Sequence, residues 1–299
     1  MTPTIPSPLV PSVASDLERS IPTARIIDLY DRGFDIDVRK YFQGLKEVQI
    51  RRCPRTGYRF YYPYQLGGDG VFYEQLDRFD WYYMPWKWEH EAALTLLQEG
   101  QKVLEIGSGD NGFLEKLHRQ GYEITGLELN EERVQDGKSR GLDIENQLIQ
   151  DHARRHPATY DAVCAFQVLE HIDEVQSFLE AAITCLKPGG SLIVCVPNNE
   201  GFIKHNENVL NLPPHHMGLW DQHSLRNLES VFSLRTENIL FQPVQKHHRR
   251  YFFTTALHRN WKIPERLAGW LSLLIPRPFA RLSPPSYSGF AVLAHYKKI

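Results

Sequence analysis

The chain has 299 residues, enough for one large α/β domain with an additional segment or for two modest domains. Its content of 42% hydrophobic and 23% charged residues is that of an ordinary globular protein. With 34 Lys and Arg against 36 Asp and Glu, the net charge of −2 gives no overall positive field, so we expect no nucleic-acid partner. The sequence has no run of about 18 uncharged apolar residues, so we expect no transmembrane helix.

The N-terminus and the cysteines bear on processing and location. Residues 1–20 are rich in proline and lack both the basic region and the apolar core of a signal peptide, so we expect a disordered tail. The four cysteines are Cys53, Cys164, Cys185 and Cys195; they form no CxxC pair, and three of the four lie in apolar runs. We therefore expect a cytoplasmic protein without a zinc site or disulfide framework.

Two regions follow the tail. Residues 21–88 form an aromatic-rich N-terminal extension, whose last 31 residues include 13 aromatic ones. Most of these rings are expected to pack against the main sheet, while Tyr82 and Tyr83 are the best candidates to close over a ligand. Residues 89–299 form the main domain, in which the basic, aromatic and proline-rich stretch 244–288 is expected to be an inserted lid or docking segment.

Short apolar strands alternate with helical stretches along the main domain. In chain order the pattern predicts a helix over 90–98, then strand 103–106, helix 112–120, strand 123–129, helix 131–141, a weak strand 147–150, strand 160–166, helix 175–186, strand 191–196, helix 224–232, and strands 235–241 and 290–296. This alternation indicates βαβ units and a parallel sheet covered on both faces. Ligands bind such a sheet beyond the carboxyl ends of its strands.

A glycine loop stands directly between the first of these strands and its helix, in VLEIGSGDNGFLEKL. Gly107, Gly109 and Gly112 allow a sharp turn and a close approach of the backbone to a ligand. A dinucleotide-binding domain would show the same spacing. Glu105 separates the two readings, because a carboxylate there repels a pyrophosphate but attracts the ammonium group of S-adenosylmethionine. Glu128, after the second strand, suits the ribose of either cofactor.

Further motifs follow the glycine loop in order: GLELN, QDH, YDAVCAFQVLEHIDE and LKPGGSLIVCVPN. Together they resemble the class I S-adenosylmethionine-dependent methyltransferase family over residues 100–243. The resemblance implies a Rossmann-like, doubly wound sheet of seven strands, the last antiparallel. It also implies that Glu128 holds the ribose, Asp151 the adenine amino group and the backbone at Gly107 and Gly109 the methionine part. The complete predicted cofactor set is Tyr83, Glu105, Gly107, Ser108, Gly109, Gly112, Glu128, Leu129, Asp151 and Gln167.

The extension and the string NLPPHHMGLWDQHSL are similar to bacterial methyltransferases that tailor sugars, glycans or natural products. Some of those relatives carry paired cysteines for zinc in the extension. Here Cys53 stands alone, with Thr56 and Gly57 at the partner positions. We accordingly predict no metal.

Methyl transfer to a hydroxyl is helped by a general base, for which histidine is the first candidate. His171 follows the fourth strand, and His215 and His216 lie in a proline-stiffened loop after the fifth. Each is a predicted catalytic residue, and each has a structural alternative: His171 as a helix-capping group, and one histidine of the adjacent pair facing outward. Asn198 and Asn199 would either orient a polar acceptor or form a turn.

The sequence therefore predicts a methyltransferase acting on a hydroxyl, less readily an amine or carbon, of a saccharide or natural product. A lipid or quinone acceptor is the first alternative. An NAD-dependent oxidoreductase and a catalytically silent binding module are the others. Residues 261–275 place Trp and Leu on one helical face, which indicates either a docked helix or a contact with a membrane or a second copy. A monomer or a homodimer fits the sequence equally well.

Overall fold

The computed structural model describes residues 4–79, 82, 84–201, 204, 208–245, 249–274 and 289–299, without the side chains of 249–251, 259, 260 and 265. Its centre is a seven-stranded sheet. Across the sheet the strands run β10 (Leu234–Phe241), β11 (Ala291–Lys298), β8 (Leu186–Pro197), β7 (Tyr160–Phe166), β4 (Lys102–Ile106), β5 (Glu123–Leu127) and β6 (Ile144–Glu145). β11 is antiparallel to both of its neighbours, and the strands from β8 to β6 are parallel. The predicted doubly wound sheet with an antiparallel last strand is confirmed.

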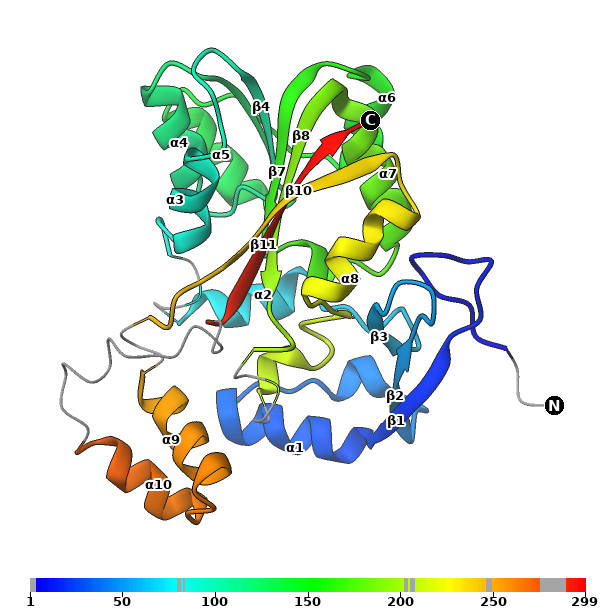
Figure 1. Ribbon diagram of the computed structural model, residues 1–299, viewed down its shortest axis with the longest axis vertical. Helices are drawn as coiled ribbons and strands as arrows, with labels where there is room; N and C mark the ends of the chain where they lie inside the picture. The colour runs from blue at the N-terminus through cyan, green and yellow to red at the C-terminus, as the bar shows by residue number, and fades with distance from the viewer. Residues whose placement is uncertain are drawn as a thin grey trace.

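Helices cover both faces of this sheet (Figure 1). One face carries α3 (Trp88–Leu94), α4 (Gly112–Arg119) and α5 (Glu131–Ser139); the other carries α6 (Ile149–Arg155), α7 (Val175–Cys185) and α8 (Gln222–Arg226). Short 3-10 turns occupy Arg39–Phe42, Leu169–His171, Val209–Asn211 and Asn227–Ser230. In α4, Phe113, Leu114 and Leu117 are buried, the helical spacing that places one apolar stripe on the sheet.

The predicted third strand over 147–150 is wrong. The strand in this position is the two-residue β6, and Ile149 already begins α6. Ile149 and Ala153 are buried four residues apart, whereas Leu148 is 51% exposed. The apolar residues therefore follow the period of a helix rather than that of a strand.

A second, smaller sheet is built mainly from the N-terminal extension. It is antiparallel throughout, in the order β1 (Asp16–Pro22), β2 (Glu47–Arg52), β3 (Arg59–Tyr62) and β9 (Gly218–Leu219). The helices α1 (Thr23–Phe34) and α2 (Gly70–Asp77) belong to the same region. β9 comes from the loop that follows β8 of the main sheet, so the extension is joined to the main domain by strand pairing as well as by the chain.

The predicted disordered tail is wrong for residues 4–20. Ser15 donates its amide to the Ile5 carbonyl at 2.8 Å, and β1 begins at Asp16. Leu9 is fully buried in the core cluster that also holds Tyr58 and Trp220. The prolines suggested disorder by composition, but the apolar residues between them have a core to join.

The described part of the predicted segment 244–288 is a helical hairpin, α9 (Arg249–Asn260) and α10 (Glu265–Ser272), which projects from the body of the molecule (Figure 1). Residues 246–248 and 275–288 of that segment lie outside the described residues. The four cysteines are buried free thiols. Within the described ranges, no helix has both the length and the apolar character needed to cross a bilayer.

The buried N-terminal segment has a measurable consequence. We expect Leu9→Ala to lower the free energy of unfolding by about 2–5 kcal/mol, the range for deleting a buried leucine side chain. Leu17→Ala is the matched control, because Leu17 lies in the same segment and is 53% exposed. Denaturant unfolding of both variants checks this, and equal, near-zero effects would contradict the packing of the segment.

Candidate functional site

A cavity of about 1670 Å³ opens at the carboxyl ends of the parallel strands. The strand order reverses at β4, which lies between β5 and β7, and the cavity is lined by the residues that follow all three strands. A site at this reversal is where open α/β sheets bind ligands. Its volume exceeds the roughly 300–1,000 Å³ of a typical ligand pocket, which leaves room for two ligands side by side.

The glycine loop after β4 adopts a backbone that favours glycine. Gly107 has φ +73° and Gly109 has φ +56°. A Cβ on Gly107 would lie 2.5 Å from the Val168 side chain. Gly112 has a different role from the predicted one: it is not among the residues that line the cavity, and a Cβ there would lie 2.0 Å from the Pro85 carbonyl oxygen. It lets α4 begin against the extension.

Glu128 holds the loop in place from the end of β5. Its Oε2 accepts a hydrogen bond from the Gly109 amide at 2.8 Å, and its Oε1 accepts from the amides of Leu129 and Asn130 at 2.8 and 2.9 Å. Leu129 is 61% exposed beside it on the cavity wall. The carboxylate thus lies at the mouth of the turn with an apolar side chain next to it, an arrangement that suits a ribose and the ring attached to it.

Glu105 lies on β4 below the same turn. It is 2% exposed, and its Oε2 is buried with no hydrogen-bond partner. Burial, together with the nearby charges of Asp110 and Glu128, raises the pKa of Glu105 well above its usual range. A cationic group in the cavity would relieve this repulsion. Ser108, also at the cavity, donates its hydroxyl to the Asn111 Oδ1 at 2.9 Å.

The remaining predicted cofactor residues have different outcomes. Gln167 lines the cavity at φ +55°, with its amide donating to the Cys195 carbonyl at 2.8 Å, a strained backbone at the end of β7. Asp151 does not line the cavity: it is half exposed and pairs with Arg154 at 2.6 Å. Its neighbour Gln150 does line it, with a buried Oε1 that lacks a hydrogen-bond partner. Tyr83 lies outside the described residues.

The three predicted catalytic histidines meet in one cluster, although the 3-10 turn with His171 and the loop with the pair are far apart in sequence. The rings of His215 and His216 stack at 4.4 Å, and His171 meets them edge-on at 4.7 and 4.9 Å. Both histidines of the pair are buried, at 5% and 4% exposure, so the expectation that one faces outward is wrong. All three line the cavity.

Hydrogen bonds to backbone carbonyls fix the tautomers of His171 and His215. Nδ1 of His171 lies 2.7 Å from the His215 carbonyl, and Nδ1 of His215 lies 2.8 Å from the Leu210 carbonyl. A carbonyl only accepts, so both Nδ1 atoms carry a proton and both Nε2 atoms offer a lone pair. Burial lowers the pKa of His171 to about 4 and that of the pair well below its ordinary value, so all three rings are neutral at pH 7.

Glu170, the neighbour of His171, is a residue of the site that the sequence does not single out. It is 1% exposed, both of its carboxyl oxygens lack a hydrogen-bond partner, and Oε1 lies 4.0 Å from Nε2 of His171. Burial raises the pKa of Glu170 to about 8. Glu170 lies in the string LEHI, but the sequence alone does not distinguish a buried carboxyl without hydrogen-bond partners from a solvated one. The Met217 amide donates to its carbonyl at 2.7 Å, which fixes this turn against the histidine loop.

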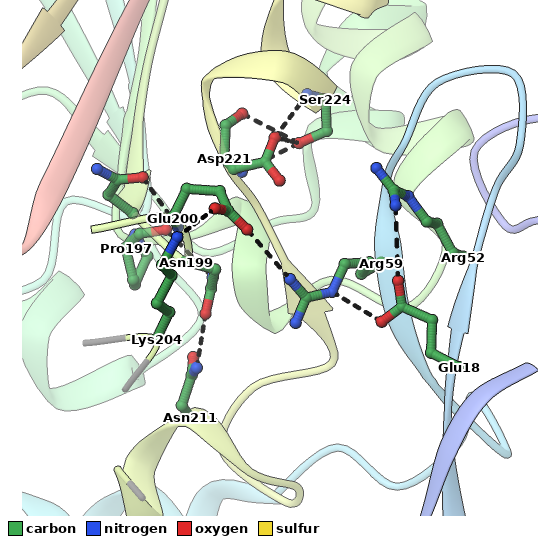
Figure 2. Close-up of polar contacts among 11 residues, drawn as sticks. Glu18, Arg52, Arg59, Pro197, Asn199, Glu200, Lys204, Asn211, Asp221 and Ser224 are labelled. Atoms are coloured by element: carbon green, nitrogen blue, oxygen red, sulfur yellow. Dashed lines mark hydrogen bonds and ion pairs between the residues drawn. The ribbon is translucent and has the colours of Figure 1, made fainter. Parts of the chain in front are cut away.

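The loop after β8 is held by a network of polar side chains (Figure 2). Asn199 accepts a hydrogen bond from the side-chain amide of Asn211 at 2.6 Å. Oδ1 of Asn211 lies 3.1 Å from Nδ1 of His216. Glu200 pairs with Arg59 of β3 at 3.7 Å. Asn199 therefore acts on His216 through Asn211, and the extension supports the loop from its other side.

The histidine cluster also raises the question of a metal. Nitrogen atoms of the three rings lie within 4.8 Å of one another. In His215, however, Nδ1 bonds the Leu210 carbonyl and Nε2 accepts from the Tyr82 hydroxyl at 2.7 Å. A cation would have to displace that hydroxyl to gain a third imidazole ligand. The hydrogen bonds within the cluster thus favour the metal-free arrangement.

Comparison with known proteins bears on the chemistry of this cavity. Residues 81–236, more than half of the chain, match the family model described as a methyltransferase domain. The protein belongs to this methyltransferase family. Its fold is that of a solved SAM-dependent methyltransferase from Archaeoglobus fulgidus, with a TM-score of 0.51 at 16% identity over 70% of this chain and 90% of that one. The match to a methyltransferase family supports S-adenosylmethionine, rather than NAD, as the cofactor.

The methyltransferase also resembles curated proteins named ubiquinone biosynthesis O-methyltransferase. One from Klebsiella pneumoniae (strain 342) is 33% identical over 108 residues, which is 34% of this chain and 45% of that protein. One from Escherichia coli (strain K12 / DH10B) is 32% identical over the same shares. The aligned region spans less than half the length of these relatives.

The residues at the cavity fit S-adenosylmethionine. Glu105 offers an orphaned carboxyl oxygen for the ammonium group, Glu128 offers a carboxylate for ribose hydroxyls, and Gln150 offers an orphaned amide oxygen for an amino group. When bound, the cofactor would supply a methyl group on a sulfonium, and the thioether released from it is a good leaving group.

We expect Glu128→Ala to weaken the binding of S-adenosylhomocysteine by about 1–3 kcal/mol, the scale of lost charge-assisted hydrogen bonds. Glu123→Ala is the matched control, because Glu123 begins the same strand but is exposed, and its carboxylate pairs with Lys102 away from the cavity. Isothermal titration of both variants measures the difference. Unchanged affinity in Glu128→Ala would remove this residue from the cofactor site.

We expect incubation with EDTA followed by gel filtration to leave methyl transfer unchanged, because the His215 nitrogens are both hydrogen-bonded within the protein. Activity of the treated protein, measured with and without added zinc, checks this. A loss of activity that zinc restores would show that the imidazoles bind a metal.

Proposed function

We propose that the methyltransferase methylates a hydroxyl group on an aromatic ring that carries an apolar substituent, the chemistry of a quinone precursor. The observation that carries the proposal is the buried pair of Glu170 and His171, which lies in the same cavity as the glycine loop. A hydroxyl acceptor must lose its proton as the methyl group is transferred, and this pair offers the groups to receive it.

The residues around the pair support an aromatic acceptor. The Tyr73 hydroxyl lies 3.1 Å from Nδ1 of His171, and Tyr82 bonds His215, so both rings stand beside the histidine cluster. Both rings line the cavity, together with Phe34 and Met84. Such a wall stacks on an aromatic ring and buries an apolar substituent. The names of the curated relatives point the same way.

We assign the cofactor and the acceptor to opposite parts of the cavity. Glu105, Glu128 and Gln150 hold the cofactor, and the glycine loop lets the backbone approach it. Glu170 and His171 flank the acceptor hydroxyl. With a good leaving group supplied by the cofactor, the protein contributes chiefly the alignment of the reactants and the exclusion of water.

The proton leaves the acceptor for this buried pair. His171 keeps its Nδ1 proton on the His215 carbonyl, so Nε2 faces Glu170 as an acceptor. The carboxyl, whose pKa of about 8 lies near the working pH, is the stronger base of the two. The other charged groups that act on it are Lys87, which lowers its pKa, and Glu89, which raises it.

The pair gives the reaction a pH dependence. Glu170 is protonated below about pH 8 and becomes a carboxylate above it, so turnover rises as the pH passes through 8. We expect Glu170→Gln to reduce turnover by about 10²–10⁴-fold and to remove this rise, because the amide accepts no proton. Cofactor affinity, measured by titration, serves as the control for folding. A retained rise in Glu170→Gln would exclude the carboxyl as the base.

A saccharide hydroxyl is the second candidate, since an aromatic wall also stacks on the face of a sugar. Transfer of a labelled methyl group separates the two candidates, with prenylated dihydroxybenzenes in one arm and hexoses and nucleotide sugars in the other. Labelling of the aromatic arm alone supports the proposal. Labelling of the sugars alone overturns it in favour of glycan tailoring.

A further inference from the structure

The α9–α10 hairpin exposes large apolar side chains together. Trp261, Leu267, Trp270, Leu273 and Leu274 are 72, 48, 59, 59 and 60% exposed. Leu267, Trp270 and Leu274 follow the i, i+3, i+7 spacing of one helical face. Single exposed apolar residues are ordinary, but a contiguous group on one projecting element marks a surface that meets another apolar phase.

The inner side of the hairpin has the opposite character. Ala268 is fully buried and Ser272 is 7% exposed, with the Thr254 hydroxyl donating to the Ser272 hydroxyl at 3.2 Å. Small and polar residues therefore join α10 to α9, while tryptophan and leucine face outward. A helix that is stabilised only by its own hairpin would bury those side chains instead. This inverted arrangement indicates that the outer face is covered in use.

The charge of this segment indicates which kind of partner covers the outer face. Residues 244–274 contain six Lys and Arg and one Glu, a net charge of +5 in a chain whose total is −2, which leaves −7 for the remainder. Lys262 and Arg266, both exposed, flank the apolar residues. Basic groups beside tryptophan and leucine are the composition of a helix that lies in the interface of an anionic membrane.

We propose that the outer face of the α9–α10 hairpin, defined by Trp261, Leu267, Trp270, Leu273 and Leu274, docks the protein onto an anionic lipid surface. The hairpin lies in the interface rather than across the bilayer, with the apolar side chains among the acyl chains and the basic ones at the headgroups. A second copy of the chain is disfavoured because it would bring two segments of +5 together. This proposal does not depend on the identity of the acceptor.

Sedimentation with vesicles tests it on the full chain. The protein is mixed with vesicles of phosphatidylcholine alone or of phosphatidylcholine with phosphatidylserine, at low and high salt. We expect binding to the vesicles that contain phosphatidylserine and a reduction by high salt. Absence of binding to both kinds of vesicle overturns the proposal.

Variants locate the contact. We expect Leu267→Ser combined with Trp270→Ser to reduce vesicle binding by roughly tenfold or more, since two large side chains no longer enter the lipid. Lys262→Glu with Arg266→Glu is expected to remove the preference for phosphatidylserine. Leu17→Ser is the matched control, because Leu17 is 53% exposed on β1 of the smaller sheet and does not line the cavity. Titration with S-adenosylhomocysteine confirms that each variant keeps its fold.

Analytical ultracentrifugation, run in parallel, identifies the competing occupant. A wild-type dimer that the Leu267→Ser/Trp270→Ser variant converts to a monomer, without any vesicle binding by the wild type, overturns the proposal and assigns the face to a second copy. Vesicle binding that the double variant retains in full also overturns it.

Discussion

The hydrogen bonds that Glu128 accepts from the backbone around it are the interaction on which the proposed cofactor side of this cavity depends. One carboxylate joins the end of β5 to the turn that follows β4, because it binds the amide of Gly109 and those of its own two successors. Two adjacent strands are thereby fixed at their carboxyl ends, where the sheet reverses its order. The buried Glu105 then lies beneath a turn of defined shape, and its unpartnered oxygen faces the space that the turn encloses.

The strand pattern could be read from the sequence wherever a strand is buried on both faces. Tyr160–Phe166 forms the strand at the predicted bounds, and the neighbouring strands differ by one to a few residues at their ends. The third strand could not be read, because β6 has only two residues and the apolar positions that follow it belong to α6. For the same reason, the prediction that Asp151 contacts the cofactor does not match its position outside the cavity. A helix in place of a strand turns Gln150 toward the cavity and Asp151 toward Arg154.

The sequence predicts the residue types at the proposed acceptor side but not their arrangement. His171, His215 and His216 were all singled out, but only tertiary packing brings His171 against the pair. Glu170 had no signal at all, since its significance lies in the absence of any hydrogen-bond partner for its buried carboxyl oxygens. The order of the N-terminal residues could not be predicted either, because composition alone suggested disorder. Their composition is that of a tail, and only the core that receives Leu9 makes them structured.

The pairing of β3 with β9 has a consequence for how the chain matures. The extension leaves the ribosome long before residues 218–219, so β3 emerges with one edge unpaired and Tyr61 without the Asn211 carbonyl that its hydroxyl later bonds. Closing that sheet requires a contact across more than 150 residues, which is slow compared with helix formation. During this interval the exposed edge is the part of the nascent chain that is most open to association with other polypeptides. Synthesis of the histidine loop both adds His215 and His216 to the cavity and pairs the open edge of β3.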